Sequence, residues 1–118
     1  MNSKDKGKRG ELEVAHILTF FGFDSRRTAQ YCGNTGDAAD VTGLEGFHIE
    51  VKRCETTKIW DWIAQAHRDH KEGEIPLVVF RKSRERWQVV LDFEDFLKIL
   101  GGKEDGNKED RSNRNQTD

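Results

Sequence analysis

The sequence is poor in features that mark secreted, membrane and zinc-binding proteins. Its 118 residues include two cysteines, Cys32 and Cys54, without CxxC spacing. No secretory leader is visible at the charged N-terminus, and no apolar run approaches the about 20 residues that span a bilayer. The four histidines have no cysteine or carboxylate partners at zinc-binding spacing, so we expect structural or surface histidines. These absences favour a protein of the reducing cytoplasm without membrane attachment.

A large net charge is absent as well. The formal net charge is −2, although 36% of the residues are charged, against about 25% in a typical domain. The total gives no sign of a nucleic-acid partner, but the distribution is uneven, because Lys4, Lys6, Lys8 and Arg9 lie in the first ten residues. A local basic patch can bind phosphate, whereas dispersed charge is simply solvated, and both interpretations stay open at this point.

The patterns that are present predict one α/β domain over residues 6–100, with a mixed sheet flanked by helices. We expect a disordered basic N-terminus at residues 1–5 and a disordered polar tail at 101–118. The predicted order is α-β-β-β-α-β-β-α, with a flexible loop at 32–38. The predicted helices cover 8–22, 56–73 and 94–100, and the strands cover 24–31, 39–43, 47–54, 75–82 and 86–93.

The strand at 47–54 carries charges where an ordinary strand would not need them. By alternation, Glu50 and Lys52 point to the face opposite Ile49. If Val41 pairs with Ile49, Asp40 lies directly across from Glu50, with Cβ atoms roughly 5 Å apart. Two facing carboxylates repel each other, and a hard divalent cation between them would reverse the sign. Alternatively, Lys52 neutralises the acids in a surface ion pair, which the hairpin alone favours slightly.

Glu11 adds weight to the first interpretation. At about 100° per residue it lies at the margin of the apolar stripe that includes Val14 and Leu18. A helix dipole also favours an acid in the first turn, so Glu11 has two explanations. Together with Asp40 and the Glu50 strand, however, it favours a site.

The segments that contain these residues resemble a known superfamily. "KGKRGELE", "AAD" and "IEVK" resemble the PD-(D/E)xK nucleases, most closely the archaeal-type Holliday-junction resolvases and their phage relatives. The resemblance runs from Lys6 to Lys52 and continues more weakly to the last strand, although Ala39 stands where the superfamily has proline. It implies a restriction-endonuclease-like fold and a homodimer that cleaves branched DNA with Mg²⁺, for which Mn²⁺ substitutes.

The resemblance also assigns residues. It implies that Asp40, Glu50 and the Val51 carbonyl bind the metal, that Glu11 assists, and that Lys52 acts on the nucleophile or the transition-state charge. Gln65 resembles a glutamine near the site of some members. The expected DNA-phosphate contacts come from basic residues that flank these segments: Lys6, Lys8, Arg9, Arg26, Arg27 and Arg53.

Two alternatives remain open at the level of sequence. The protein could be a nicking or restriction-like nuclease that acts on ordinary duplex DNA, because the superfamily contains such enzymes with the same core. It could instead be a catalytically inactive DNA-binding module of the same fold. The resemblance suggests a phage origin, in which case the expected location is the host cytoplasm.

Overall fold

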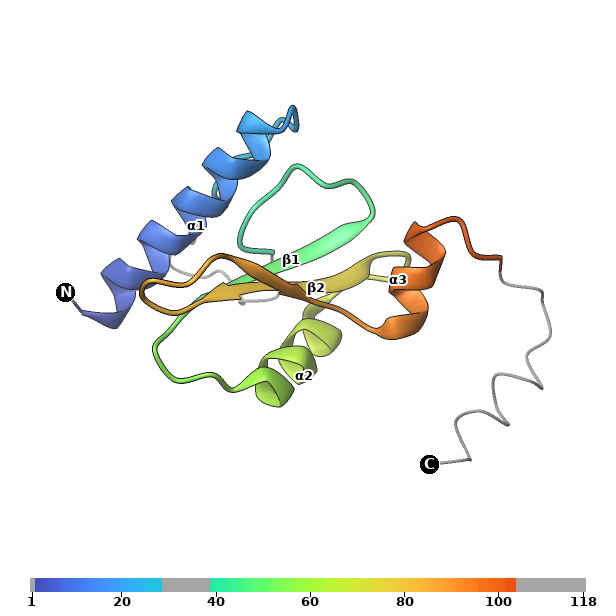
Figure 1. The fold of residues 1–118 in the computed structure, drawn as a ribbon. Helices are drawn as coiled ribbons and strands as arrows, with labels where there is room; N and C mark the ends of the chain where they lie inside the picture. Colours follow the sequence, from blue (N-terminus) through green and yellow to red (C-terminus); the bar gives the residue numbers. More distant parts are fainter. Residues whose placement is uncertain (1, 29–38, 104–118) are drawn as a thin grey trace.

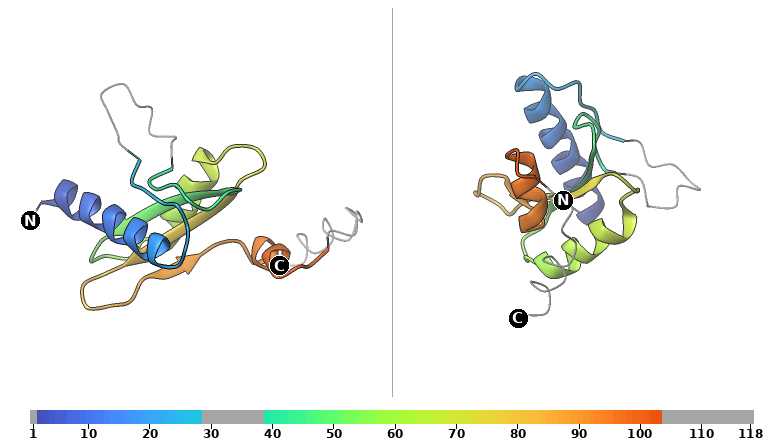
Figure 2. Two further views of the ribbon diagram at one scale, coloured as in Figure 1. Left: turned by 90° about the horizontal axis from the view of Figure 1, so that it is seen from above. Right: turned by 90° about the vertical axis from the view of Figure 1, so that its right-hand side faces the viewer.

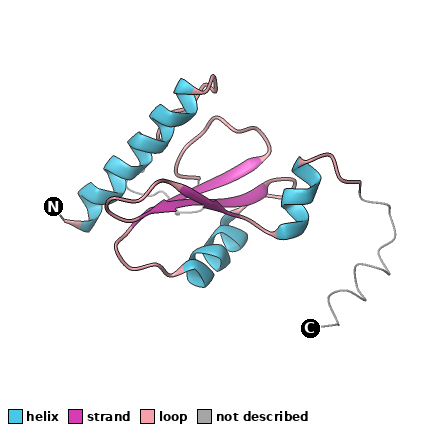
Figure 3. Ribbon diagram, in the orientation of Figure 1, coloured by secondary structure: helices cyan, strands magenta, loops and turns pink. Residues whose placement is uncertain are grey.

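The structure is a computed structural model that describes residues 2–28 and 39–103 (Figures 1 and 3). Over these residues it contains three helices and one three-stranded mixed sheet, which confirms the predicted α/β, restriction-endonuclease-like class. The elements in chain order are α1 (Ser3–Phe20), β1 (Phe47–Arg53), α2 (Ile59–Asp69), β2 (Ile75–Arg81), β3 (Gln88–Val90) and α3 (Phe93–Ile99).

The sheet has the order β1-β2-β3. β1 and β2 run parallel, and the register places Glu50 beside Val78. Parallel neighbours need a crossover connection, which α2 supplies. β3 then returns antiparallel to β2. β1 is therefore bordered by β2 on one edge, and its other edge faces the segment around Val41.

The two long helices cover opposite faces of the sheet, as the views in Figure 2 show. α1 packs on one face through a cluster that includes Val14, Ala15, Ile49 and Val51. α2 packs on the other face through a smaller cluster of Trp62, Ala66 and Val78. Because β1 is covered from both sides, Glu50 is buried, and Lys52 and Arg53 are partly buried.

Within residues 24–28 and 39–43, the two strands predicted before β1 are present only as single bridges. Arg27 pairs with Val41, and Val41 pairs with Ile49, both antiparallel. The predicted Val41–Ile49 pairing is therefore confirmed, but regular strands at 24–31 and 39–43 are not found among the described residues. One local cause is that the Asp40 side chain, and not a backbone carbonyl, accepts the Val51 N–H.

The first helix begins earlier than the sequence prediction. We expected residues 1–5 to be disordered, but α1 starts at Ser3, capped by Asn2, whose side chain accepts the Asp5 N–H at 2.9 Å. An asparagine at this position satisfies an otherwise unpaired amide of the first turn. The helix ends at Phe20, and Gly22 follows with a φ of 98°. The predicted stop at this glycine is correct to within two residues.

The remaining boundaries are close to the prediction, with shorter elements. α2 and β3 occupy only the central parts of 56–73 and 86–93, and α3 begins one residue before 94. The predicted loop at 32–38 and the tail after residue 103 lie outside the described residues. No described helix is long and apolar enough to cross a membrane.

Candidate active site

Asp40 and Glu50 form the centre of the site. The Val41–Ile49 bridge sets them across from each other, and each carboxyl group influences the pKa of the other. Burial, followed by the nearby Glu50 charge, raises the pKa of Asp40 to about 7. Burial also raises the pKa of Glu50 to about 7, although the Lys52 ammonium opposes that shift. Both groups are thus poised to lose protons near neutral pH.

The backbone of Val51 lies beside this pair. Its N–H donates to Asp40 Oδ2 at 2.7 Å, and the Ile49 carbonyl accepts the Asp40 N–H at 2.9 Å. Residues two apart in a strand direct their backbone groups to the same edge. The Val51 carbonyl therefore points to the edge that carries Asp40, away from β2.

Lys52 is oriented by a residue of α2. Its ammonium donates to Gln65 Oε1 at 2.6 Å, and it is close enough to lower the pKa values of Asp40 and Glu50. Gln65, which the sequence linked to the site only by resemblance, thus contacts the lysine of the site directly.

Glu11 lies on α1 and is close enough to Asp40 and Lys52 for their charges to affect its pKa. Arg27 Nε donates to its Oε1 at 2.6 Å, and both side chains are largely buried. Burial and the Asp40 charge raise the pKa of Glu11, while Arg27 and Lys52 oppose the shift. Arg27, which we expected to contact DNA, is therefore paired with a site residue in this structure.

Two further residues at the site were missed by the sequence analysis. His48 is 2% exposed, and its Nε2 lies 2.7 Å from Glu50 Oε1. Asp69 of α2 raises the pKa of Glu50. Strand alternation puts His48 on the face of Glu50, but it does not show that α2 covers this face. Asp69 stands one helical turn after Gln65, a spacing that could have indicated it.

The donor set fits a hard divalent cation. The buried Glu50 carboxyl and the partly buried Asp40 carboxyl provide oxygen ligands, and the Val51 carbonyl points to the same edge. No group of three or more His, Cys, Asp or Glu side chains in the described part of the chain is arranged to hold a metal. Mg²⁺ needs no such group, because it is often bound by one or two carboxylates while water and substrate phosphates complete its shell.

The other basic residues that we expected to contact DNA are either exposed or paired with an acid. Lys8, Arg9 and Arg26 are exposed. Lys6 and Arg53 instead contact Glu55, Lys6 Nζ at 3.1 Å and Arg53 Nη1 at 2.7 Å.

Comparison with known proteins gives a matching family and a similar fold. The sequence model of the family described as "Phage putative PDDEXK endonuclease" matches residues 2–115. No curated protein matches the sequence. Among solved structures, the fold is similar to Hjc, a Holliday junction resolvase from the archaeal hyperthermophile Archaeoglobus fulgidus. The TM-score is 0.55 at 22% identity, over 73% of this chain and 72% of the other.

Proposed function

Since this chain belongs to the family of phage PD-(D/E)xK endonucleases, we propose that it cleaves DNA phosphodiesters with a divalent metal ion, and that its substrate is branched DNA of the four-way-junction type. The observation that carries the proposal is the facing pair of carboxyl groups at Asp40 and Glu50, with the Lys52 ammonium on the same strand held by Gln65. Buried acids of this kind are costly to a fold, and a site that uses them explains their presence.

In this proposal, Asp40, Glu50 and the Val51 carbonyl hold Mg²⁺, or Mn²⁺ in its place, with Glu11 assisting. The ion would supply an activated water and neutralise charge on the phosphate. The Lys52 ammonium stabilises charge on the phosphate or orients the attacking water. Gln65 fixes the direction of that ammonium, because its Oε1 accepts from Lys52 Nζ.

The preference for branched DNA is supported by the similarity of the fold to that of the Archaeoglobus resolvase. Exposed basic residues give a second support. Lys8, Arg9 and Arg26 are exposed and would bind backbone phosphates, which position a substrate without reading its sequence. Such contacts suit an enzyme that recognises the shape of DNA.

A homodimer belongs to the same proposal. Phe93, Phe96, Leu97 and Leu100 follow i, i+3, i+4, i+7 spacing, and all four are exposed, between 39% and 73%. α3 contains no buried residue. An apolar helix face of this kind is typical of an interface. A second copy of the chain would cover it and would provide a second active site for the opposite strand of a junction.

The test is cleavage of a synthetic four-way junction against a linear duplex of the same sequence in Mg²⁺. We expect symmetric cuts in the junction and little cutting of the duplex. Asp40→Asn should abolish cleavage and retain junction binding. Equal cutting of both substrates would indicate a duplex nuclease. Binding by the unaltered protein without cleavage, in Mg²⁺ and in Mn²⁺, would indicate an inactive DNA-binding module.

A further inference from the structure

We propose that Lys6, Arg53 and Ser83 form a binding site for one backbone phosphate of DNA, which the Glu55 carboxylate occupies in the free protein. We call these three residues the anion cradle. The inference rests on the proposed function, because it names how the nuclease holds its substrate. It adds a phosphate position, and a competing side chain, outside the Asp40–Glu50 centre.

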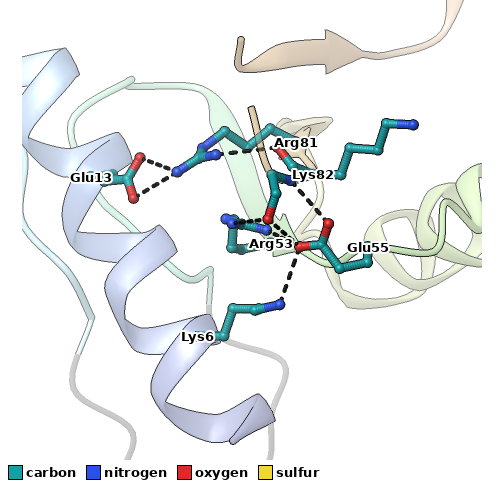
Figure 4. A network of polar contacts seen from close by, with 7 residues as sticks. Lys6, Glu13, Arg53, Glu55, Arg81 and Lys82 are labelled. Carbon is teal, nitrogen blue, oxygen red and sulfur yellow. Dashed lines mark hydrogen bonds and ion pairs between the residues drawn. The ribbon is translucent and has the colours of Figure 1, made fainter. Parts of the chain in front are cut away.

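The cradle brings four donors to one carboxylate (Figure 4). Glu55 Oε2 accepts from Lys6 Nζ at 3.1 Å, from Arg53 Nη1 at 2.7 Å and from Ser83 Oγ at 2.9 Å. Glu55 Oε1 accepts the Ser83 backbone N–H at 3.1 Å. The donors come from α1, from the end of β1 and from the loop after β2, so the fold converges on this point from three segments.

The donors are held in place by other contacts. Arg53 Nη2 donates to Ser83 Oγ at 3.1 Å. α1 passes close to Arg53 because it has no side chain at Gly10, where an added Cβ would lie 2.8 Å from Arg53 Cβ. The cradle thus lies at a close helix–strand crossing and combines one backbone N–H with three side-chain donors.

A phosphate group can displace the Glu55 carboxylate from the cradle. The Glu55 side chain is 48% exposed, so solvent and a DNA strand can reach it. The hydrogen bonds from Arg53 and Ser83 hold the pKa of Glu55 well below its usual range, which reflects a strong preference of this place for an anion. A phosphate group binds the same kinds of donor, namely backbone N–H, hydroxyl, lysine and the planar fork of arginine.

The cradle lies next to the candidate active site along the chain. Arg53 directly follows Lys52 but points to the other face of β1, and Lys6 lies on the helix that carries Glu11. A DNA strand that crosses the C-terminal end of β1 could place one phosphate at the centre and another in the cradle. Glu55 would then have to leave before the second phosphate binds.

The test measures DNA affinity after the competitor is removed. In an Asp40→Asn background, which prevents cleavage, Glu55→Gln is compared with the parent by fluorescence anisotropy on a labelled four-way junction. We expect binding to tighten by about three- to tenfold. The slope of log affinity against log salt should steepen by about one counterion, because one more phosphate is contacted.

A matched control separates the cradle from simple loss of negative charge. Glu85→Gln removes the same charge two residues from Ser83, and the Glu85 side chain is exposed. We expect a smaller change with this variant and no added salt slope. Equal effects of the two variants would overturn the proposal, and so would weaker binding by Glu55→Gln, which would make Glu55 a brace for the basic residues.

A second measurement needs no DNA, and its first readout uses the unaltered chain. Inorganic phosphate is titrated into the ¹⁵N-labelled unaltered chain while the Ser83 amide resonance is followed by NMR. We expect the Ser83 amide resonance to shift and to saturate as phosphate is added. In Glu55→Gln the same shift should saturate at a lower phosphate concentration. The Glu85 amide resonance should show no comparable shift. Absence of a shift at Ser83 would overturn the cradle. If Asp40→Asn binds no DNA while Ser83 responds to phosphate, the proposed function fails and the anion site stands.

Discussion

Among single residues, Gln65 has the clearest supporting role, because it orients the Lys52 ammonium through a hydrogen bond of 2.6 Å. We predict that Gln65→Ala lowers kcat on a four-way junction by about 10- to 100-fold, the usual effect of losing a partner of a site residue. KM should change little, because the lysine charge remains. Gln65→Glu keeps an acceptor oxygen and should restore part of kcat. A loss confined to KM, or no difference between the two variants, would contradict this role.

The Asp40–Glu50 pair makes stability depend on pH in a definite direction. Each carboxyl has a folded-state pKa of about 7, against about 4 in an unfolded chain. Between these values the folded protein keeps protons that the unfolded chain has lost, so metal-free protein should lose stability as pH rises from about 4 to 8. Urea unfolding across this range measures the slope, which should be shallower in Asp40→Asn. A stability that rises over the same window would contradict the assignment.

Metal affinity should depend on pH in the opposite direction to the stability of the metal-free protein. Because a cation needs both carboxyls deprotonated, Mg²⁺ or Mn²⁺ affinity should rise with pH through about 7, and binding should release protons. Isothermal titration calorimetry in buffers of different ionisation enthalpy counts those protons. Equal affinity at pH 6 and pH 8 would show that the pair does not hold the ion.

At the scale of elements, the close crossing of α1 over β1 depends on Gly10 and not on Gly7, which lies about one helical turn earlier. A Cβ at Gly10 would meet Arg53 Cβ at 2.8 Å, whereas a Cβ at Gly7 has nothing within 4 Å. Gly10→Ala should therefore lower the free energy of unfolding by about 1–3 kcal/mol through overpacking. Gly7→Ala should raise it by about 0.5–1 kcal/mol, because alanine favours the helix. Urea denaturation of the two variants gives the comparison, and the same sign for both would refute the close crossing.

The elements also show what sequence patterns can and cannot establish. Alternation in β1 correctly placed Glu50 and Lys52 on one face, and the Val41–Ile49 pairing followed from matching apolar positions. Periodicity gives the face of a residue but not what covers it, so burial of His48 under α2 was missed. The early start of α1 depends on one residue, because the Asn2 side chain caps a segment whose charges predict disorder.

At the scale of the whole molecule, long-range contacts were the least predictable feature. Lys6, Arg53 and Ser83 meet at Glu55 although they are up to 77 positions apart in sequence. No local pattern links them, and only the packing of α1 on the sheet brings them together. The contact between Lys52 and Gln65 has the same origin, and sequence reached Gln65 only through a family resemblance.

Assembly is also a property of the whole molecule, and a substitution on α3 tests the proposed homodimer. Its exposed apolar face includes Phe96, which is 43% exposed, and α3 lies at the end of the sheet away from the N-terminus of α1 (Figures 1 and 2). We predict that Phe96→Glu converts a dimer to a monomer in sedimentation analysis, because two buried charges would oppose the interface.

The control is Phe21→Glu, which places the same charge at a residue that is 72% exposed beyond the end of α1 and should leave the dimer intact. In the Phe96→Glu monomer, each binding event brings one active site to the junction. We therefore expect the paired cuts to become uncoupled, so that nicked junctions accumulate before the second strand is cut. Unaltered protein that sediments as a monomer would refute the interface, as would paired cutting that survives in the monomeric variant.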